Sequence, residues 1–309
     1  MNSPLPTPPP PIFSAHSAFE DAFVYYGMCD ASAAAALGTD LFVVANDERN
    51  ELLVYRRGVA RPVAEVDLSP FLGTKKDQES DLEGAATIGE RIYWISSHGR
   101  NKKGNHQEGR HRFFATQLRN GVVVPVGQPY AGLLADLVAA PHLQRYAFAQ
   151  ASGLSPEADS AFNIEGLAAT LQGGVLIGLR NPAPRGMALI IPLLNPAQII
   201  DGAAAVFGEA IELDLGGLAI RSIDLVADTY VIVAGAPADR GRFALYRWSG
   251  DASDQPVAVA HADFATLRPE AIFAIPGTSS LQILSDDGGK HVKDTPQRDQ
   301  AFKSVTLTL

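Results

Sequence analysis

A short sequence pattern recurs five times along this chain of 309 residues. In each copy a brief apolar run is followed by a turn that contains Gly or Asp, and then by a second apolar run. Runs this short, bounded by turn residues, are typical of buried strands rather than of helices. The copies begin at residues 32, 83, 165, 222 and 270. Spacings near 50 residues, with several strands in each repeat, are typical of the blades of a β-propeller.

Further apolar runs complete the repeats. Third strands are expected at residues 51–56, 111–118, 187–194, 242–248 and 302–309, and fourth strands at 63–68, 122–126, 210–215 and 257–262. A spare strand over residues 22–26 precedes the first repeat and would complete the last blade, so that no long edge stays open. The sequence therefore predicts an all-β fold, a five-bladed β-propeller of four-stranded antiparallel blades.

The domain organisation follows from the same spacing. Residues 1–15 include a proline-rich stretch and predict a disordered lead-in, and residues 16–309 predict a single propeller domain. The widest gap between repeats contains an insertion at about residues 130–160, whose apolar spacing suits one or two short helices interrupted at Pro141. The 28 Gly and 21 Pro argue against a helical bundle, because both residues break helix interiors.

Charge and cysteine content limit the partners. The net charge of −9 argues against nucleic-acid binding, and no apolar segment is long enough to cross a bilayer. The only cysteine, Cys29, cannot form an intrachain disulfide. We expect a cytoplasmic protein of bacterial type, with no nucleic-acid or membrane partner and with an oligomeric state that the sequence leaves open.

Equivalent positions in the five repeats converge on one ring, because the first strand of each propeller blade lines the central channel. The aligned residues are Ser32, Glu83, Glu165, Ser222 and Glu270. Three carboxylates around one axis repel one another unless a cation lies between them. Such oxygen ligands suit Ca²⁺, and suit Mg²⁺ less well because it demands a tighter octahedron. In the alternative interpretation, the three glutamates cap backbone groups or pair with Arg221 and Arg268.

The residues two positions before the ring, Asp30, Asp81 and Asn163, are expected to support it. The order Ser, Glu, Glu, Ser, Glu over five blades resembles the calcium-activated nucleotidase (apyrase) family. That resemblance implies a five-bladed propeller, one axial Ca²⁺ held by the five ring residues, and hydrolysis of nucleoside di- and triphosphates. The nucleotide-binding segments of that family are not found in this sequence.

Over its whole length the chain more closely resembles the bacterial domain-of-unknown-function family 3616. The resemblance is carried by Asp-Leu-Glu-Gly-Ala at residues 81–85, Asn-Ile-Glu-Gly-Leu at 163–167 and Arg-Pro-Glu-Ala-Ile at 268–272. That family has no established activity that could be transferred to this chain.

Basic side chains concentrate in the loops between second and third strands, which would surround the ring. The candidate substrate-binding residues are Arg49, Arg100, Arg180, Asn181 and Arg240. Arginine forks suit phosphate or carboxylate oxygens. His98 is a candidate general acid or base, since its ordinary pKa near 6.5 permits both roles, and Asp47, Asp286 and Asp287 are further candidates.

These features predict a calcium-dependent hydrolase of a small anionic ester or anhydride, most readily one that contains phosphate. The metal would orient the phosphate and polarise a water molecule. The alternative is a non-enzymatic propeller, in which a structural axial calcium pins the blades and the rim binds a protein or a small acid. A further alternative is a lactonase or esterase of the kind found in other calcium propellers.

Overall fold

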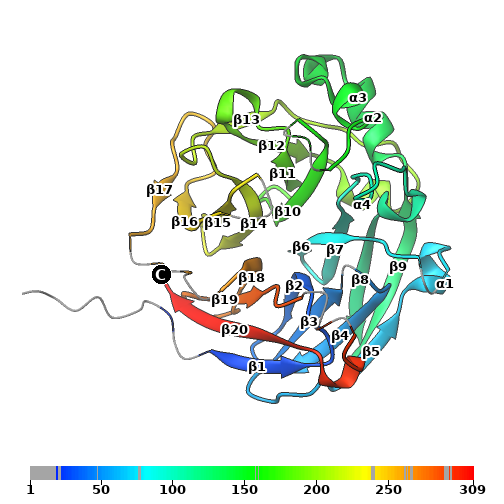
Figure 1. Cartoon of the computed structure of the whole chain (residues 1–309), viewed down its shortest axis with the longest axis vertical. Coiled ribbons are helices and arrows are strands. Elements are labelled where there is room, and N and C mark those ends of the chain that lie inside the picture. The colour runs from blue at the N-terminus through cyan, green and yellow to red at the C-terminus, as the bar shows by residue number, and fades with distance from the viewer. Residues whose placement is uncertain are drawn as a thin grey trace, which may run out of the picture.

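In the computed structural model, five antiparallel sheets of four strands surround a central axis, and Figure 1 looks down this axis. The structure describes residues 19, 22–46, 48–75, 78–156, 158, 160–237, 241–260, 262, 264, 267–288, 292 and 294–309. The predicted lead-in at residues 1–15 lies outside this part of the chain. The five-bladed propeller that the repeats predicted is confirmed.

The first three blades follow the chain in order. Blade one consists of β2 (Ala31–Leu37), β3 (Leu41–Asn46), β4 (Glu51–Arg56) and β5 (Ala64–Asp67). Blade two consists of β6 (Leu82–Ile88), β7 (Arg91–Ser96), β8 (Phe113–Arg119) and β9 (Val122–Tyr130). Blade three consists of β10 (Asn163–Ala169), β11 (Val175–Asn181), β12 (Ala188–Leu193) and β13 (Ile211–Leu213).

The last two blades complete the circle. Blade four consists of β14 (Ala219–Val226), β15 (Thr229–Gly235), β16 (Phe243–Trp248) and β17 (Val257–Ala258). Blade five consists of β18 (Pro269–Ala274), β19 (Ser280–Ser285), β20 (Ala301–Thr308) and the N-terminal β1 (Phe23–Tyr26). Strand β1 pairs with β20 in the register Phe23↔Ser304. The predicted closure by a strand from the beginning of the chain is therefore confirmed, and it joins the two ends of the domain.

Helical segments are short. They are α1 (Ser69–Leu72), α2 (Leu133–Ala139), α3 (Phe148–Ala151), α4 (Pro196–Ile199), and 3₁₀ turns at Glu108–Arg110, Pro141–Tyr146, Pro184–Gly186 and Gln297–Asp299. Helices α2 and α3 and the turn between them form the helical insertion, which packs Leu133, Leu137 and Phe148 into the core of blades two and three. None of the described helices is long and apolar enough to cross a membrane.

The first strands β2, β6, β10, β14 and β18 contact one another in sequence around the axis. Glycine permits part of this close approach. A Cβ atom on Gly84 of β6 would lie 2.8 Å from the Cβ of Leu167, and one on Gly166 of β10 would lie 2.9 Å from side-chain atoms of Ile220 and Ile223. The Glu-Gly pairs of the sequence pattern thus place an acidic residue and a close interstrand contact side by side.

Candidate functional site

A bulge in each first strand creates the axial ring. The ladder between first and second strands skips one residue in every blade, at Ser32, Glu83, Glu165, Arg221 and Glu270. A bulged residue leaves the regular alternation of faces, which re-aims its side chain. The same bulge occurs five times around one axis, and the side chains of Glu83, Glu165, Arg221 and Glu270 line one cavity.

The fourth position of this ring differs from the sequence alignment. Ser222 lies within the ladder, opposite Val233, and Arg221 is the bulged residue. The Ser222 hydroxyl accepts a hydrogen bond from the backbone N–H of Ile272 in the next blade, at 3.2 Å. The ring therefore contains an arginine one residue before the expected serine. Alignment of the apolar runs placed Ser222 at this position, whereas the pairing of β14 with β15 assigns it to Arg221.

Arg221 bridges two of the ring carboxylates. Its Nε lies 2.9 Å from Glu165 Oε2, and the two groups form an ion pair in which the Nε–H does not point at the oxygen. Its Nη2 donates a hydrogen bond to Glu270 Oε1 at 2.5 Å. Glu165 also accepts hydrogen bonds from Arg180 Nη1 at 2.9 Å and from Asn163 Nδ2 at 3.1 Å. Asn163 thus supports the ring as the spacing predicted.

The arginines of this cluster favour the ionised state of Glu165, and the glutamates favour the charged state of Arg221. Burial opposes the charge on Arg221, but Glu165 and Glu270 offset it and raise the pKa of Arg221. Burial raises the pKa of Glu165, although Arg221 and Arg180 oppose this. With two guanidinium groups within 2.9 Å of its oxygens, we take Glu165 as ionised.

The ring does not fit the predicted calcium ion in this arrangement. A guanidinium group already supplies the positive charge between Glu165 and Glu270, and the expected hydroxyl ligand of Ser222 is engaged by the backbone of Ile272. Within the described part of the chain, no group of three or more His, Cys, Asp or Glu residues is arranged to hold a metal. For Glu165 and Glu270, the alternative interpretation of pairing with Arg221 describes the observed contacts.

A polar cavity of about 950 Å³ opens over the ring. Acidic and basic side chains line it in similar numbers. The acidic ones are Glu48, Glu79, Asp81, Glu83, Glu165, Glu270 and Asp286, and the basic ones are Lys75, Arg100, Lys102, Lys103, Arg110, Arg180, Arg221 and Arg268. A cavity of this size with converging polar groups is the usual form of a small-molecule site.

Asp286 is the cavity carboxylate best placed for proton transfer. Burial and then the charge of Glu270 raise its pKa to about 7, against the opposing effects of the Gly288 N–H and Arg268. The Gly288 N–H donates to Asp286 Oδ1 at 2.7 Å, and Arg268 Nη2 lies 3.5 Å from Oδ2. A carboxyl group with this pKa is present in both protonation states near neutral pH.

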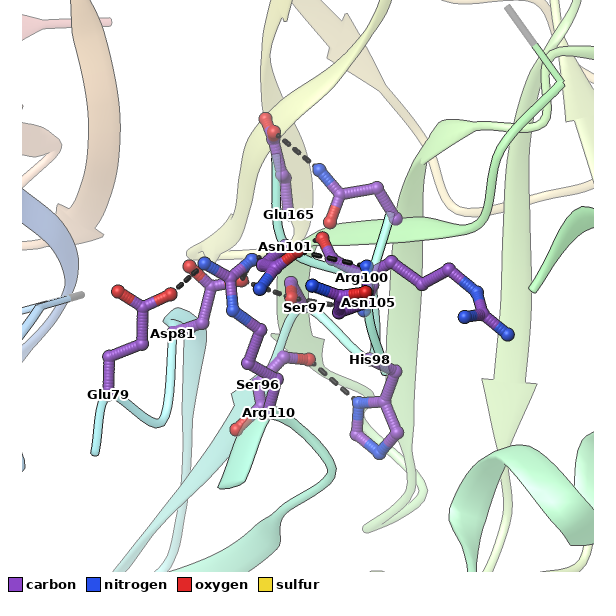
Figure 2. Close-up of polar contacts among 12 residues, drawn as sticks. Glu79, Asp81, Ser96, Ser97, His98, Arg100, Asn101, Asn105, Arg110 and Glu165 are labelled. Carbon is purple, nitrogen blue, oxygen red and sulfur yellow. Dashed lines mark hydrogen bonds and ion pairs between the residues drawn. The ribbon is translucent and has the colours of Figure 1, made fainter. Parts of the chain in front are cut away.

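A second carboxylate cluster stands at the side of the cavity, where the residues before β6 meet the loop that joins β7 and β8 (Figure 2). Arg110 extends between Glu79 and Asp81, and its Nη1 lies 2.8 Å from Asp81 Oδ2. Asp81 also accepts a short hydrogen bond from the Ser97 hydroxyl. Burial raises the pKa of Asp81 to about 6, although the Ser97 bond opposes this.

Arg100 anchors the same loop to the helical insertion. Its Nε donates to the backbone oxygen of Ser152 at 2.8 Å, and its Nη1 donates to that of Gly104 at 3.0 Å. The side chain lines the cavity, as a substrate-binding residue should, and two of its donors bind backbone carbonyls. The neighbouring Lys102 and Lys103 also line the cavity.

His98 lies away from the cavity. Its side chain turns away from Asp81 and Glu165, and its Nδ1 lies 2.8 Å from the backbone oxygen of Ser96. The imidazole of His98 borders a small apolar pocket beneath α2, and burial lowers the pKa of His98 to about 3. A buried, neutral imidazole outside the cavity does not fit the predicted acid–base role.

Three other predicted residues also lie outside the cavity lining. Asp287 accepts a hydrogen bond from the Lys303 N–H at 2.9 Å, Arg49 donates to Gln300 at 2.6 Å, and Asn181 is buried at the end of β11. Asp47 and Arg240 lie outside the described residues. Of the predicted substrate-binding and acid–base residues, the structure thus brings Arg100, Arg180 and Asp286 to the cavity.

Sequence reasoning missed the roles of Arg221 and Arg268 as members of the site. The sequence suggests them only as alternative partners for the ring glutamates. Arg268 pairs with Asp286, and the available signal was its position two residues before Glu270, where Asp81 and Asn163 stand relative to their own glutamates.

Comparison with solved structures supports the fold. The chain is similar to glutaminyl cyclase of Myxococcus xanthus, with 10% sequence identity, 94% of this chain and 96% of that chain covered, and a TM-score of 0.53. More distant similarity extends to a putative oxidoreductase (glucose dehydrogenase) of Thermus thermophilus, with 14% identity, 92% and 100% coverage and a TM-score of 0.46. It also extends to the PQQ-bound aldose sugar dehydrogenase of Streptomyces coelicolor, with 12% identity, 93% and 98% coverage and a TM-score of 0.45.

At 10% identity, the similarity to glutaminyl cyclase indicates the fold alone. No curated protein matches the sequence. The family model described as "Protein of unknown function (DUF3616)" matches residues 115–280, from β8 to the start of β19. Since this match covers more than half of the chain, the protein belongs to the domain-of-unknown-function family 3616.

Proposed function

We propose that the axial cavity is the active site of a hydrolase that acts on a small anionic ester or anhydride through side-chain acid–base chemistry. The observation that carries the proposal is the convergence of Asp286 with Arg221 and Arg268 in one polar cavity. This combines a carboxyl group that titrates near neutral pH with guanidinium groups that can stabilise negative charge.

The reaction needs few parts. Ionised Asp286 takes a proton from a water molecule as the water oxygen attacks the phosphorus or carbonyl carbon of the substrate. Negative charge that develops on the substrate oxygens is stabilised by Arg268, whose side chain is half-exposed in the cavity. As the bond to the leaving oxygen breaks, protonated Asp286 returns the proton to that oxygen.

The lysines at the cavity rim favour binding of an anionic substrate. Lys75, Lys102 and Lys103 line the cavity. Compact ammonium groups of this kind bind phosphate or carboxylate as point charges. A phosphate-containing substrate remains the first choice, as the basic loops predicted.

The test is a turnover screen of phosphate monoesters, phosphoanhydrides, lactones and carboxylic esters between about pH 5 and pH 9, the range in which a group of pKa near 7 titrates. Each reaction is run in EGTA and in added calcium chloride, which separates the metal-free reaction from the calcium-dependent one that the ring predicted. We expect turnover in EGTA that is abolished in D286N. The absence of turnover on every substrate class would contradict the proposal.

D287N is the matched control, because the neighbouring carboxylate faces Lys303 rather than the cavity. We expect D287N to keep the pH profile of the native protein. The alternative of a non-enzymatic propeller is favoured by the ion pairs that join three blades at the ring, and it predicts that inorganic phosphate or a small carboxylate binds at the rim without turnover.

A further inference from the structure

The bulged ring positions come from all five blades, and Arg221 is the cation among them. We propose that Arg221 is a built-in replacement for an axial metal ion, so that this propeller balances its ring charge and holds its blades together without calcium. The proposal concerns the architecture of the ring and does not depend on the hydrolase activity.

The geometry shows how one side chain can act in this way. Arg221 projects from β14 of blade four and contacts Glu165 on β10 of blade three at 2.9 Å and Glu270 on β18 of blade five at 2.5 Å. A planar guanidinium with several fixed donors can bind two carboxylates at once, whereas an ammonium group acts as a point charge. One arginine therefore links three consecutive blades, as a central metal ion would.

The charges explain why a cation is required there. Glu83, Glu165 and Glu270 converge on one ring, and Asp286 stands beside Glu270. The side chains of Arg221 and Glu165 are 9% and 5% exposed, so water screens their charges weakly. The carboxylates of all three ring glutamates contribute to raising the pKa of Arg221.

The donor set points the same way. The expected second hydroxyl ligand, Ser222, is held by the N–H of Ile272, and its position in the ring is taken by Arg221. Calcium takes six to eight oxygen ligands. Because Arg221 pairs with Glu165 and Glu270, two of the three ring carboxylates are not free to bind calcium.

The experiment measures thermal unfolding of the full chain after exhaustive dialysis against EGTA, and again with calcium chloride or magnesium chloride added to millimolar concentration. We expect the Tm of the native protein to be the same in all three conditions. An ion that bound the native ring would raise the Tm by several degrees, because binding to the folded state stabilises it. Such a rise with calcium would overturn the proposal.

Two variants test the charge role directly. In EGTA we expect R221S to have a Tm many degrees below that of the native protein. R221K keeps the positive charge but loses the two-armed guanidinium, and we expect its Tm to lie between the other two. We further expect the Tm of R221S to rise when E270Q is added to it, or when calcium is supplied, since either change relieves the repulsion and leaves the pair of Arg180 with Glu165 in place. If R221S unfolds like the native protein in EGTA, or if neither change raises its Tm, Arg221 does not balance the ring.

The control is R185S. Arg185 also pairs with a glutamate, Glu212, but its side chain is 75% exposed. Exposed ion pairs contribute little to stability. We therefore expect R185S to unfold within about a degree or two of the native protein, in the range that a change of a few tenths of a kcal/mol gives for a domain of this size.

Discussion

Two arginines in the same cavity each lie between two carboxylates, yet they hold different parts of the molecule. Arg110 follows β7 and pairs with Glu79 and Asp81, which precede β6 of the same blade, so its contacts stay at one blade. Arg221 pairs with Glu165 and Glu270, which belong to the blades on either side of its own. The first arrangement, the loop cluster, shapes the wall of the cavity. The second, the ring cluster, ties the blades together.

Solvent exposure separates the two clusters further. The side chain of Glu165 is 5% exposed, whereas that of Glu79 is 35% exposed. A buried ion pair is costly to break from one side, because the remaining charge is left without a partner in a medium of low polarity. An exposed partner is replaced by water at little cost. The same residue types therefore have different energetic weight according to where the fold places them.

The largest expected effect comes from E165Q. This change removes the negative charge that faces both Arg221 and Arg180, and we expect it to lower the free energy of unfolding by about 3–5 kcal/mol. The counterpart E79Q, in the loop cluster, should lower it by at most about 1 kcal/mol. Urea unfolding of both variants measures the difference. If both variants lose the same free energy of unfolding, the ring cluster contributes no more to stability than the loop cluster.

The ring also shows how far the sequence could predict this molecule. The period of the apolar runs was sufficient for five blades and for closure by residues 23–26, because strand alternation and turn residues are local properties. Ring positions such as Glu83 and Glu165 followed from the same alignment. Arg221 did not, because the bulge position in blade four depends on how β14 pairs with β15, which the hydrophobic pattern does not record.

The burial of single side chains was equally hard to predict. His98 and Arg100 are two residues apart in one loop, yet the imidazole borders the apolar pocket beneath α2 while the guanidinium reaches the backbone of the insertion. The positive φ of His98 helps to turn its side chain away from the axis. Local sequence could not distinguish these directions, because they depend on contacts with α2 and α3.

A moderate effect is expected from R110A in the loop cluster. The change leaves the buried Asp81 with the Ser97 hydroxyl as its remaining side-chain donor among the described contacts. We expect a loss of about 1–2 kcal/mol, since a buried acceptor loses one partner. Hydrogen exchange should quicken at residues 97–112 and stay unchanged in β14 and β18. Faster exchange in those ring strands would show that the two clusters are coupled.

The smallest effect on stability, and one of opposite sign, is expected at Asp224, a carboxylate that forms no ion pair with an arginine among the described residues. Asp224 on β14 accepts a hydrogen bond from the Ala274 N–H at 2.7 Å, and no ion pair of Asp224 occurs within the described residues. Burial raises its pKa from 3.8 to about 6, against the effect of backbone N–H groups. The folded state therefore holds this proton more tightly than the unfolded state.

The contribution of Asp224 to stability is fully present below about pH 4 and is lost as the pH rises through about 6. An asparagine keeps the acceptor for Ala274 and carries no charge, so D224N should gain on the order of 1 kcal/mol at pH 7.5. Comparing urea unfolding of D224N with that of the native protein from pH 4 to 8 isolates this contribution. If D224N instead loses stability at pH 7.5, the carboxylate is balanced by a positive charge after all, and the contrast with the two arginine clusters fails.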